Sequence, residues 1–141
     1  MDDKYYPVGA MIGAISDAKN KLLFASDFRK QAKDFYQQKV ADVYEYYERE
    51  LRKNNALDFD DLLLVAVKLL QTNAAVLDKY SKRFRYVMID EYQDTNHAQY
   101  LLASLLSSHW KNIAVVGDAN KSIYNWSGAD IQNIKDFEQN Y

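Results

Sequence analysis

The stretch that decides the fold is RYVMIDEYQDTN, which runs from Arg85 to Asn96. Residues of the kind that proteins bury, Tyr86 to Ile89, are followed at once by Asp90 and Glu91, and a third acid follows at Asp94. Like charges crowded at the end of an apolar strand repel one another and add nothing to stability. We therefore expect a positively charged ligand at this point of the chain.

A second short apolar run, NIAVVG, lies downstream at Asn112 to Gly117. Both runs have the form of strands that a parallel sheet buries on both faces. Between them, apolar side chains repeat at helical spacing, at Ala98, Leu101, Leu102, Leu105 and Leu106. A strand, a helix and a strand in this order predict a βαβ unit. Two parallel strands are not a whole sheet, so we expect its remainder to be missing or supplied elsewhere.

The first half of the chain predicts helices, because the whole sequence holds only four glycines and one proline. Apolar spacing predicts a helix over Ile12–Leu22 and one long amphipathic helix over Phe28–Leu51. Asp58, with Asp61 three positions later, predicts a capping-box-like start of the next helix. A short helix is expected over Asn73–Tyr80.

Composition bounds the function. The 141 residues suffice for one compact domain, and 48% hydrophobic with 27% charged residues is an ordinary soluble globular composition. The net charge of −2 gives no global attraction for nucleic acid, so any such contact needs local patches. The absence of cysteine excludes disulfides and thiolate metal sites and favours an intracellular setting. His97 and His109 are too far apart for a helical metal pair and are expected at the surface or in packing.

Neither a membrane span nor a secretory signal is expected, because no apolar stretch approaches about 20 residues and the N-terminus lacks a charged-then-apolar pattern.

The acids lie where ligands bind in open α/β sheets, beyond the carboxyl ends of the strands. Asp90 and Glu91 end the first strand, and Gly117-Asp118 ends the second. Magnesium usually takes one or two carboxylates together with substrate phosphates, and a neighbouring acid can act as general base on water. The alternative is that Asp90 simply caps the following turn. The short pattern alone leaves both open.

The longer strings are more specific. DEYQDTN (Asp90 to Asn96) resembles the Walker B segment, motif II, of superfamily 1 DNA helicases of the UvrD/PcrA/Rep family. VVGDANKSIYNWSGAD (Val115 to Asp130) resembles their motif III, and LDFDDLL (Leu57 to Leu63) the segment before the Walker B strand. ISDAKNKL (Ile15 to Leu22) and the tyrosine-rich helix after it resemble the helical 1B insertion of PcrA-like enzymes. The resemblance continues to Tyr141 and covers nearly all of the chain.

The resemblance implies an α/β fold class, namely a partial P-loop NTPase (RecA-like) parallel sheet with a largely α-helical insertion. Residues 1–56 would be the insertion, and residues 57–141 part of the first motor domain. The implied function is that of a fragment of an ATP-dependent DNA helicase that translocates 3′ to 5′ on single-stranded DNA and unwinds duplex in repair or replication. Its partners would be single-stranded and forked DNA and the remaining helicase domains, with no membrane, in a cytoplasmic, nucleoid-associated setting.

Site roles follow from the same resemblance. Asp90 and Glu91 would hold Mg²⁺ on the nucleotide phosphates, and Glu91 would also polarise the attacking water. Gln93 and Lys121 would lie at the nucleotide, and Asp94 would support the turn. A bound cation would explain why acids are tolerated at the strand end.

The DNA-contacting residues implied are Tyr124, Asn125 and Trp126, since aromatic faces stack on single-stranded bases. Core packing is the alternative for the aromatic rings. The insertion's basic residues would contact duplex DNA or, because acids are interspersed, form a solvated helix face; they are Lys19, Lys21, Arg29, Lys30 and Lys33. The tyrosines at positions 36, 44, 46 and 47 are expected to pack. The acids at positions 58, 60 and 61 are expected to be helix N-terminal charges rather than a metal site.

The chain contains no G-x-x-x-x-G-K-[ST] string, the loop that cradles phosphates in P-loop NTPases. We therefore expect ATP and Mg²⁺ to serve the complete protein, and this piece to bind neither and to be inactive alone. Lys121 replaces the family's usual glutamine and Ser127 its usual arginine. These departures leave open a DNA- or protein-binding module with a retired motor site. A motor within a recombination helicase–nuclease subunit is the other alternative.

Overall fold

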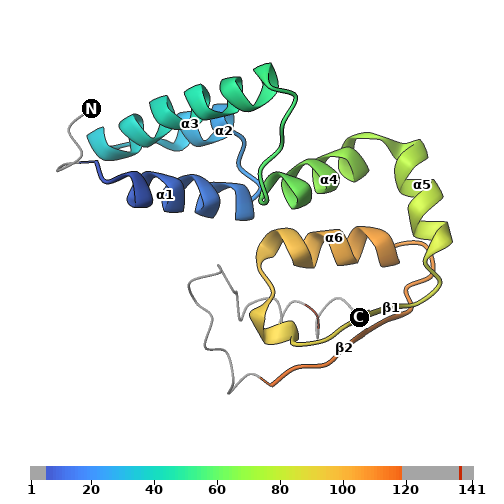
Figure 1. Cartoon of the computed structure of the whole chain (residues 1–141). Helices are drawn as coiled ribbons and strands as arrows, with labels where there is room; N and C mark the ends of the chain where they lie inside the picture. The colour runs from blue at the N-terminus through green and yellow to red at the C-terminus, as the bar shows by residue number, and fades with distance from the viewer. Residues whose placement is uncertain (1–5, 119–136, 138–141) are drawn as a thin grey trace. The chain divides into compact units, whose positions relative to one another are not determined.

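The computed structural model describes residues 6–118 and residue 137, and the chain divides into two compact units, Met1–Leu62 and Leu63–Tyr141 (Figure 1). The first unit is helical, and the second contains the short sheet. The division falls inside one helix, so the two units are described one at a time.

The first unit contains α1 (Val8–Asn20), α2 (Ala25–Gln31) and α3 (Phe35–Lys53). The prediction of one long helix from Phe28 to Leu51 was wrong, because the chain leaves the helical conformation between α2 and α3. Asp34 there has extended backbone, and its side chain accepts a hydrogen bond of 2.7 Å from the N–H of Gln37. An aspartate that satisfies a free N–H in this way starts a new helix, which apolar spacing alone does not reveal.

The core of this unit lies where α1, α2 and α3 meet. Its buried side chains are Met11, Ile15, Ala18, Ala25, Val40 and Tyr44. Tyr44 is fully buried, and its hydroxyl donates a 2.9 Å hydrogen bond to the Leu23 carbonyl. The expectation of packed tyrosines is confirmed for Tyr44 alone, since Tyr36, Tyr46 and Tyr47 are exposed. Of these four rings, only that of Tyr44 is part of the core.

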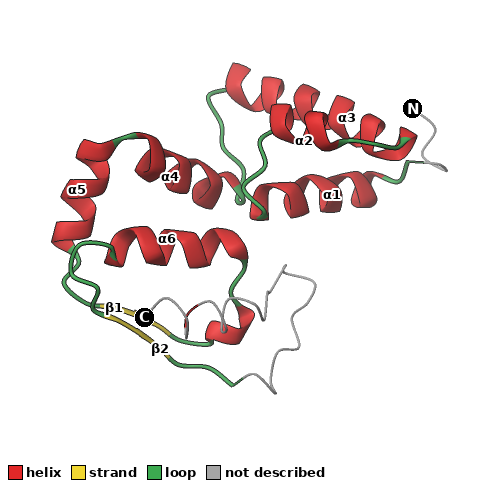
Figure 2. Ribbon diagram, turned by 180° about the vertical axis from the view of Figure 1, so that it is seen from behind, coloured by secondary structure: helices red, strands yellow, loops and turns green. Residues whose placement is uncertain are grey.

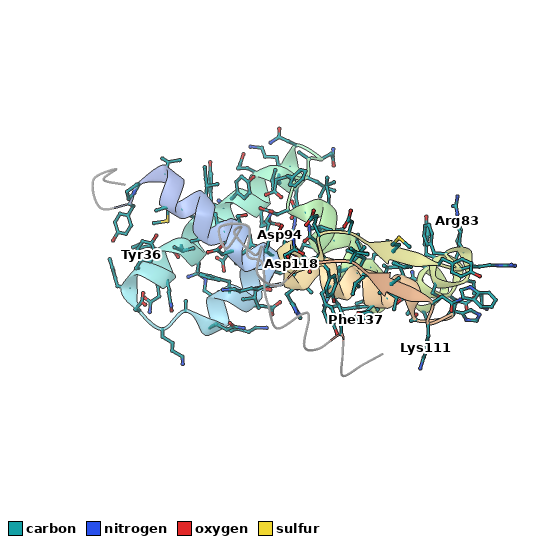
Figure 3. The ribbon with its side chains drawn as sticks, turned by 90° about the horizontal axis from the view of Figure 1, so that it is seen from below. Tyr36, Arg83, Asp94, Lys111, Asp118 and Phe137 are labelled. Carbon is teal, nitrogen blue, oxygen red and sulfur yellow. The ribbon has the colours of Figure 1, made fainter. Side chains whose placement is uncertain are left out.

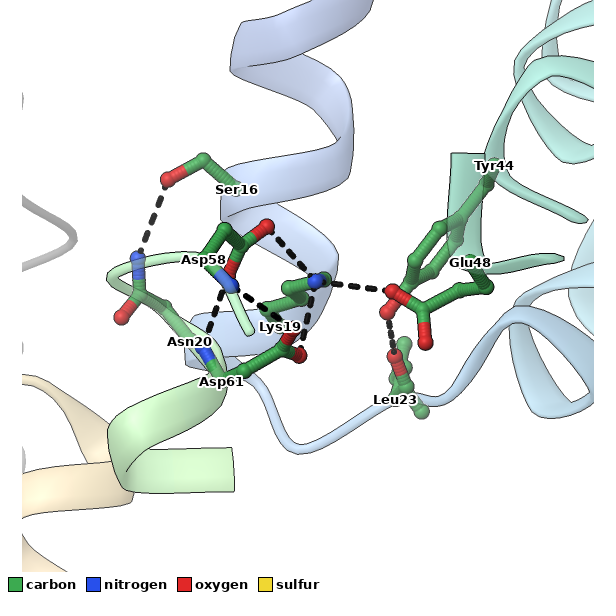
Figure 4. Close-up of polar contacts among 8 residues, drawn as sticks. All are labelled: Ser16, Lys19, Asn20, Leu23, Tyr44, Glu48, Asp58 and Asp61. Carbon is green, nitrogen blue, oxygen red and sulfur yellow. Dashed lines mark hydrogen bonds and ion pairs between the residues drawn. The ribbon is translucent and has the colours of Figure 1, made fainter. Parts of the chain in front are cut away.

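A buried lysine joins three carboxylates beside this core (Figure 4). The Lys19 ammonium lies 2.7 Å from Asp58, 2.7 Å from Asp61 and 2.8 Å from Glu48, and the residue is 1% exposed. Burial by itself disfavours the cation, but the hydrogen bonds that the ammonium donates to the three carboxylates outweigh it and raise the pKa of Lys19. Burial likewise opposes ionisation of Asp58, and the Lys19 hydrogen bond still holds its pKa below the ordinary value.

The same acids begin α4 (Asp61–Thr72). The N–H of Asp61 donates to an Asp58 carboxylate oxygen at 2.8 Å, and the N–H of Asp58 donates to Asp61 at 3.2 Å. These reciprocal bonds confirm the predicted capping-box-like start. They also leave oxygens on both acids for Lys19.

The second unit carries the βαβ unit (Figure 2). After α5 (Ala74–Arg83) come β1 (Val87–Ile89), a 3₁₀ turn (Tyr92–Asp94), α6 (His97–Ser107) and β2 (Ile113–Val115). The strands pair in parallel, with Val87 opposite Ile113 and Ile89 opposite Val115. The predicted strand, helix and strand are confirmed, and the fold is mixed α/β and mostly helical.

The expectation that these strands are buried on both faces was wrong. Side chains alternate along a strand, and Val87 and Ile89 are half-buried whereas Met88 between them is 77% exposed. On β2, Ala114 is exposed in the same register. Parallel strands are buried on both faces only where helices cover both faces. In the part of the chain described here, the crossover helix α6 contacts β1, and the Met88 face is left exposed.

None of the helices in residues 6–118 is both long and apolar enough to cross a membrane.

The Lys19 cluster predicts a large and specific loss of stability. Lys19→Met should lower the free energy of unfolding of the chain by about 3–5 kcal/mol, because it leaves three carboxylates close together without their cation. Urea denaturation followed by circular dichroism measures this. Lys30→Met is the matched control, since Lys30 pairs with Asp27 at the exposed surface and should cost about 1 kcal/mol or less. Equal losses for the two variants would contradict the buried cluster.

The same cluster predicts opposite pH responses. In the wild type the pKa of Asp58 is lowered by Lys19, so the stability that this carboxylate contributes is present above its unfolded pKa and is lost as the pH falls through the folded value. In Lys19→Met, burial without a cation favours the neutral acids, so acidification from pH 7 to about 4 should stabilise the variant. Unfolding midpoints should therefore rise for the variant between pH 7 and about 4, where the wild-type contribution of Asp58 is still in place, and should fall for the wild type below about pH 4.

Candidate functional site

The carboxyl ends of β1 and β2 meet at one edge, because the strands are parallel. Pairing continues past the strands, where the N–H of Tyr92 donates to the Val116 carbonyl at 2.9 Å. In Figure 3, Asp94 and Asp118 lie near each other at this edge, while Arg83 and Lys111 lie at the opposite end of the unit. The segments that the sequence analysis singled out after each strand are thus side by side.

Asp90 and Glu91 present exposed carboxylates at this edge. One Asp90 oxygen accepts a 2.9 Å hydrogen bond from the N–H of the next residue, Glu91, but the residue at the N-terminal end of the 3₁₀ turn is Glu91, which makes no side-chain capping bond. Glu91 itself has left-handed backbone, with φ 50° and ψ 44°. That conformation is costly for a residue with a Cβ and is concentrated at functional positions.

Gln93 is buried beneath the acids, 1% exposed, and its side chain joins the two loops. Its amide nitrogen donates to a Glu91 carboxylate oxygen at 2.6 Å, and its amide oxygen accepts from the N–H of Asp118 at 2.9 Å. Gly117 makes room for this side chain, since a Cβ there would lie 2.6 Å from the Gln93 amide oxygen. The expected nucleotide contact of Gln93 stays a prediction, because its amide is engaged with protein groups.

Asp94 has one carboxylate oxygen, Oδ1, that is buried and lacks a hydrogen-bond partner in the described part of the chain. The other, Oδ2, lies 3.5 Å from the Gln93 amide nitrogen. Beside it is an open cavity of about 390 Å³, lined by Ile89, Asp90, Glu91, Asp94, Thr95, Gln99, Leu102 and Ala103. A buried acceptor without a donor is costly unless a ligand or ion completes it.

The start of α6 fixes the other wall of this cavity. Asn96 caps the helix by accepting from the N–H of Gln99 at 2.9 Å, and the Gln99 side chain accepts from the N–H of Asn96 at 2.9 Å. The Thr95 hydroxyl donates to the Tyr92 carbonyl at 2.7 Å. Thr95, Asn96 and Gln99 are therefore held by bonds to near neighbours in the sequence, whereas Tyr92 and Gln93 are also held by the segment after β2.

The donor chemistry fits a magnesium ion accompanied by phosphates. Within the described residues, no group of three or more acids or histidines is placed to enclose a metal by itself. Magnesium keeps several waters and needs only one or two carboxylates from the protein. The ion pairs found in the described residues leave Asp90, Glu91 and Asp94 without a cation, in contrast to the acids around Lys19. The residues that could hold the ion are therefore Asp90 and Glu91, with Asp94 as an addition that the sequence analysis assigned only to the turn.

A second cavity, of about 380 Å³, lies in the helical unit and is lined mainly by apolar side chains such as Met11, Ile12 and Ile15. Because apolar side chains dominate the lining of this cavity, the edge of the sheet remains the candidate site.

Several expected site residues lie outside the described residues. These are Lys121, Tyr124, Asn125 and Trp126, together with Ser127.

The structure changes the account of the insertion's basic residues. Neither alternative for Lys19 was right, because it is buried in the acid cluster and faces neither DNA nor solvent. Arg29 forms ion pairs with Asp42 at 2.9 Å and with Glu45 at 2.6 Å, so these two acids of α3 largely balance its charge. Lys21 and Lys33 are exposed, as a solvated face requires.

For Lys19 and Gly117, the sequence contains an indication of the position that each takes in the structure. Lys19 follows Met11 and Ile15 at helical spacing, so it belongs to the apolar face of α1. Gly117 is a lone glycine after an apolar strand, which often marks close approach of another group.

The comparisons with known proteins agree on one family. Residues 2–141 match the family described as UvrD/REP helicase N-terminal domain. The ATP-dependent DNA helicase PcrA of Staphylococcus aureus (strain Mu50) is 50% identical over all 141 residues of the chain. PcrA of Staphylococcus epidermidis (strain ATCC 35984) is 49% identical over the same length. The chain spans 19% of the length of each of these relatives.

Proposed function

The chain belongs to the UvrD/REP helicase N-terminal domain family, and we propose that it works as part of an ATP-dependent DNA helicase. In this proposal the complete protein translocates 3′ to 5′ on single-stranded DNA and unwinds duplex in repair or replication. Single-stranded and forked DNA and the other helicase domains are its partners, in the cytoplasm at the nucleoid. The activity belongs to the complete protein, because this chain contains no phosphate-cradling loop.

The observation that carries the proposal is the pairing of the acid-rich turn after β1 with the segment after β2. The Gln93 side chain links the two, with hydrogen bonds of 2.6 Å to Glu91 and 2.9 Å from Asp118. In α/β sheets such adjacent strand ends are where ligands bind. The 50% identity to PcrA over the whole chain supports the same activity.

We further propose how the chain is divided. The three helices of the first unit correspond to the helical insertion, residues 1–56, and residues 57–141 to part of the first motor domain. The parallel β1–β2 pair would then be a piece of a RecA-like P-loop NTPase sheet, completed by other strands of the complete protein. The exposed Met88 and Ala114 face supports this, since a larger α/β sheet has helices on both sides.

At the site, Asp90 and Glu91 would hold the metal, and the Glu91 carboxylate would accept a proton from the attacking water. Magnesium bound with ATP would supply charge neutralisation at the phosphates. Gln93 holds one Glu91 carboxylate oxygen at 2.6 Å. The other oxygen then remains to take the proton.

Two further sets of residues complete the proposal. Lys121 would approach a phosphate as a point charge, in place of an amide. Tyr124, Asn125 and Trp126 would contact single-stranded DNA, the aromatic rings by stacking on bases.

Glu91→Gln tests the catalytic assignment in the complete protein. ATP hydrolysis should fall by roughly 10²–10⁴-fold, while nucleotide affinity stays nearly unchanged, because the change removes a base and not a phosphate contact. Steady-state ATPase rates and titration with a fluorescent nucleotide separate the two effects. Glu50→Gln, a surface change on α3, is the matched control and should leave both values unchanged.

Parallel loss of nucleotide binding and hydrolysis in Glu91→Gln would contradict the role of Glu91 as the base. A complete wild-type protein that lacks DNA-stimulated ATPase would instead favour the module with a retired motor site.

Trp126→Ala tests the DNA contact. In the complete protein it should weaken binding of single-stranded DNA by roughly 1–3 kcal/mol, the range for one lost base stack. DNA-stimulated ATPase should fall more than basal ATPase, with little change in thermal stability. Fluorescence anisotropy with a labelled oligonucleotide gives the affinity. A melting temperature lowered by many degrees with unchanged DNA affinity would show that the ring belongs to the core.

A further inference from the structure

We propose that Gln93 is a positioning residue that sets the orientation of Glu91 according to the position of the segment that follows β2. This inference rests on the proposed function, because it gives Glu91 its role as base. It assigns Gln93 to protein groups on both sides of its amide rather than to the nucleotide.

The two ends of the Gln93 amide contact different segments, with Glu91 as the shorter partner of the nitrogen and Asp94 Oδ2 at 3.5 Å as the longer one. The nitrogen donates to Glu91 at 2.6 Å on the β1 side, and the oxygen accepts from the Asp118 N–H at 2.9 Å on the β2 side. The side chain is 1% exposed, so water does not compete for either bond. One rigid group therefore spans from the carboxylate to the backbone of the neighbouring loop.

Only an amide of this length satisfies both neighbours. A carboxylate at position 93 would repel Glu91 and leave it without a donor, and an apolar side chain would leave the Asp118 N–H without its acceptor. Asparagine is one methylene shorter and cannot span the same distance from the same backbone. The residue type thus follows from the two groups it joins.

Gly117 is the steric partner of this arrangement. Its backbone lies outside the left-handed region that favours glycine, so alanine is tolerated there by the backbone itself. The obstacle is contact: a Cβ would lie 2.6 Å from the Gln93 amide oxygen and 3.2 Å from the N atoms of Gln93 and Tyr92. Gly117→Ala therefore displaces the Gln93 side chain without altering any charge.

The Gln93 amide couples the Glu91 carboxylate to the backbone of Asp118, because it is hydrogen-bonded to both. If the backbone at Asp118 moves, the amide oxygen loses its donor, and the amide can then turn away from Glu91. The segment after β2 and the orientation of the Glu91 carboxylate are linked through a single side chain. Hydrolysis would thereby depend on where that segment lies.

The experiment measures kcat, KM and nucleotide affinity in the complete protein for Gln93→Ala, Gly117→Ala and the double variant. Each single change should lower kcat about 10–100-fold, in line with a base displaced by about 1 Å, while nucleotide affinity changes less than about threefold. In the Gln93→Ala background the effect of Gly117→Ala should shrink at least tenfold, because the atom it collides with is gone. Ala114→Ser, on the exposed face of β2, is the control and should leave kcat unchanged.

Two results would overturn the inference. Full additivity of the two substitutions would show that they act independently, and a nucleotide affinity that falls in step with kcat would make Gln93 a nucleotide contact. Melting temperatures of the same four proteins test the contact without activity, and should also be non-additive. A wild type without ATPase would reject the proposed function, whereas normal ATPase in the wild type and in Gln93→Ala would reject only the positioning role.

Discussion

The parallel pairing of β1 with β2 is the constraint on which the candidate site depends. Because both strands run in the same direction, their carboxyl ends emerge at one edge, and the turn after Ile89 meets the segment after Val115. The 2.9 Å bond from Tyr92 to Val116 extends the pairing into the loops. Antiparallel pairing would have separated Glu91 from Asp118 by the length of the sheet, and no side chain could then join them.

Two groups of acids in this chain show how the same charges serve different ends. Around Lys19 three carboxylates share one buried cation at 2.7–2.8 Å, and the cluster is complete within the protein. At the strand ends Asp90, Glu91 and Asp94 have no such cation among the described residues, and one Asp94 oxygen lacks any hydrogen-bond partner. The first arrangement stabilises the fold, while the second has the unbalanced charge that a ligand site requires.

Much of this was accessible from local sequence. Both strands, the crossover helix and the cap at Asp58 follow from spacing and from capping chemistry, which act over a few residues. The break at Asp34 was missed because one cap overrides a continuous apolar period. The place of Lys19 on the apolar face of its helix is visible locally, but the partners that make its burial possible, Glu48 and Asp61, are far away along the chain. The link between Gln93 and Asp118 likewise needs the sheet pairing before it can be seen.

The Lys19 cluster has a consequence for how this sequence can diverge. Lys19 comes from α1, Glu48 from α3, and Asp58 and Asp61 from the start of α4, so distant positions share one charge balance. Loss of the lysine alone leaves three carboxylates without their cation. Replacing all four residues by apolar ones of similar volume removes this charge imbalance altogether. The four positions are therefore expected to change together among homologous sequences, as a linked set that a family-wide covariation signal would detect.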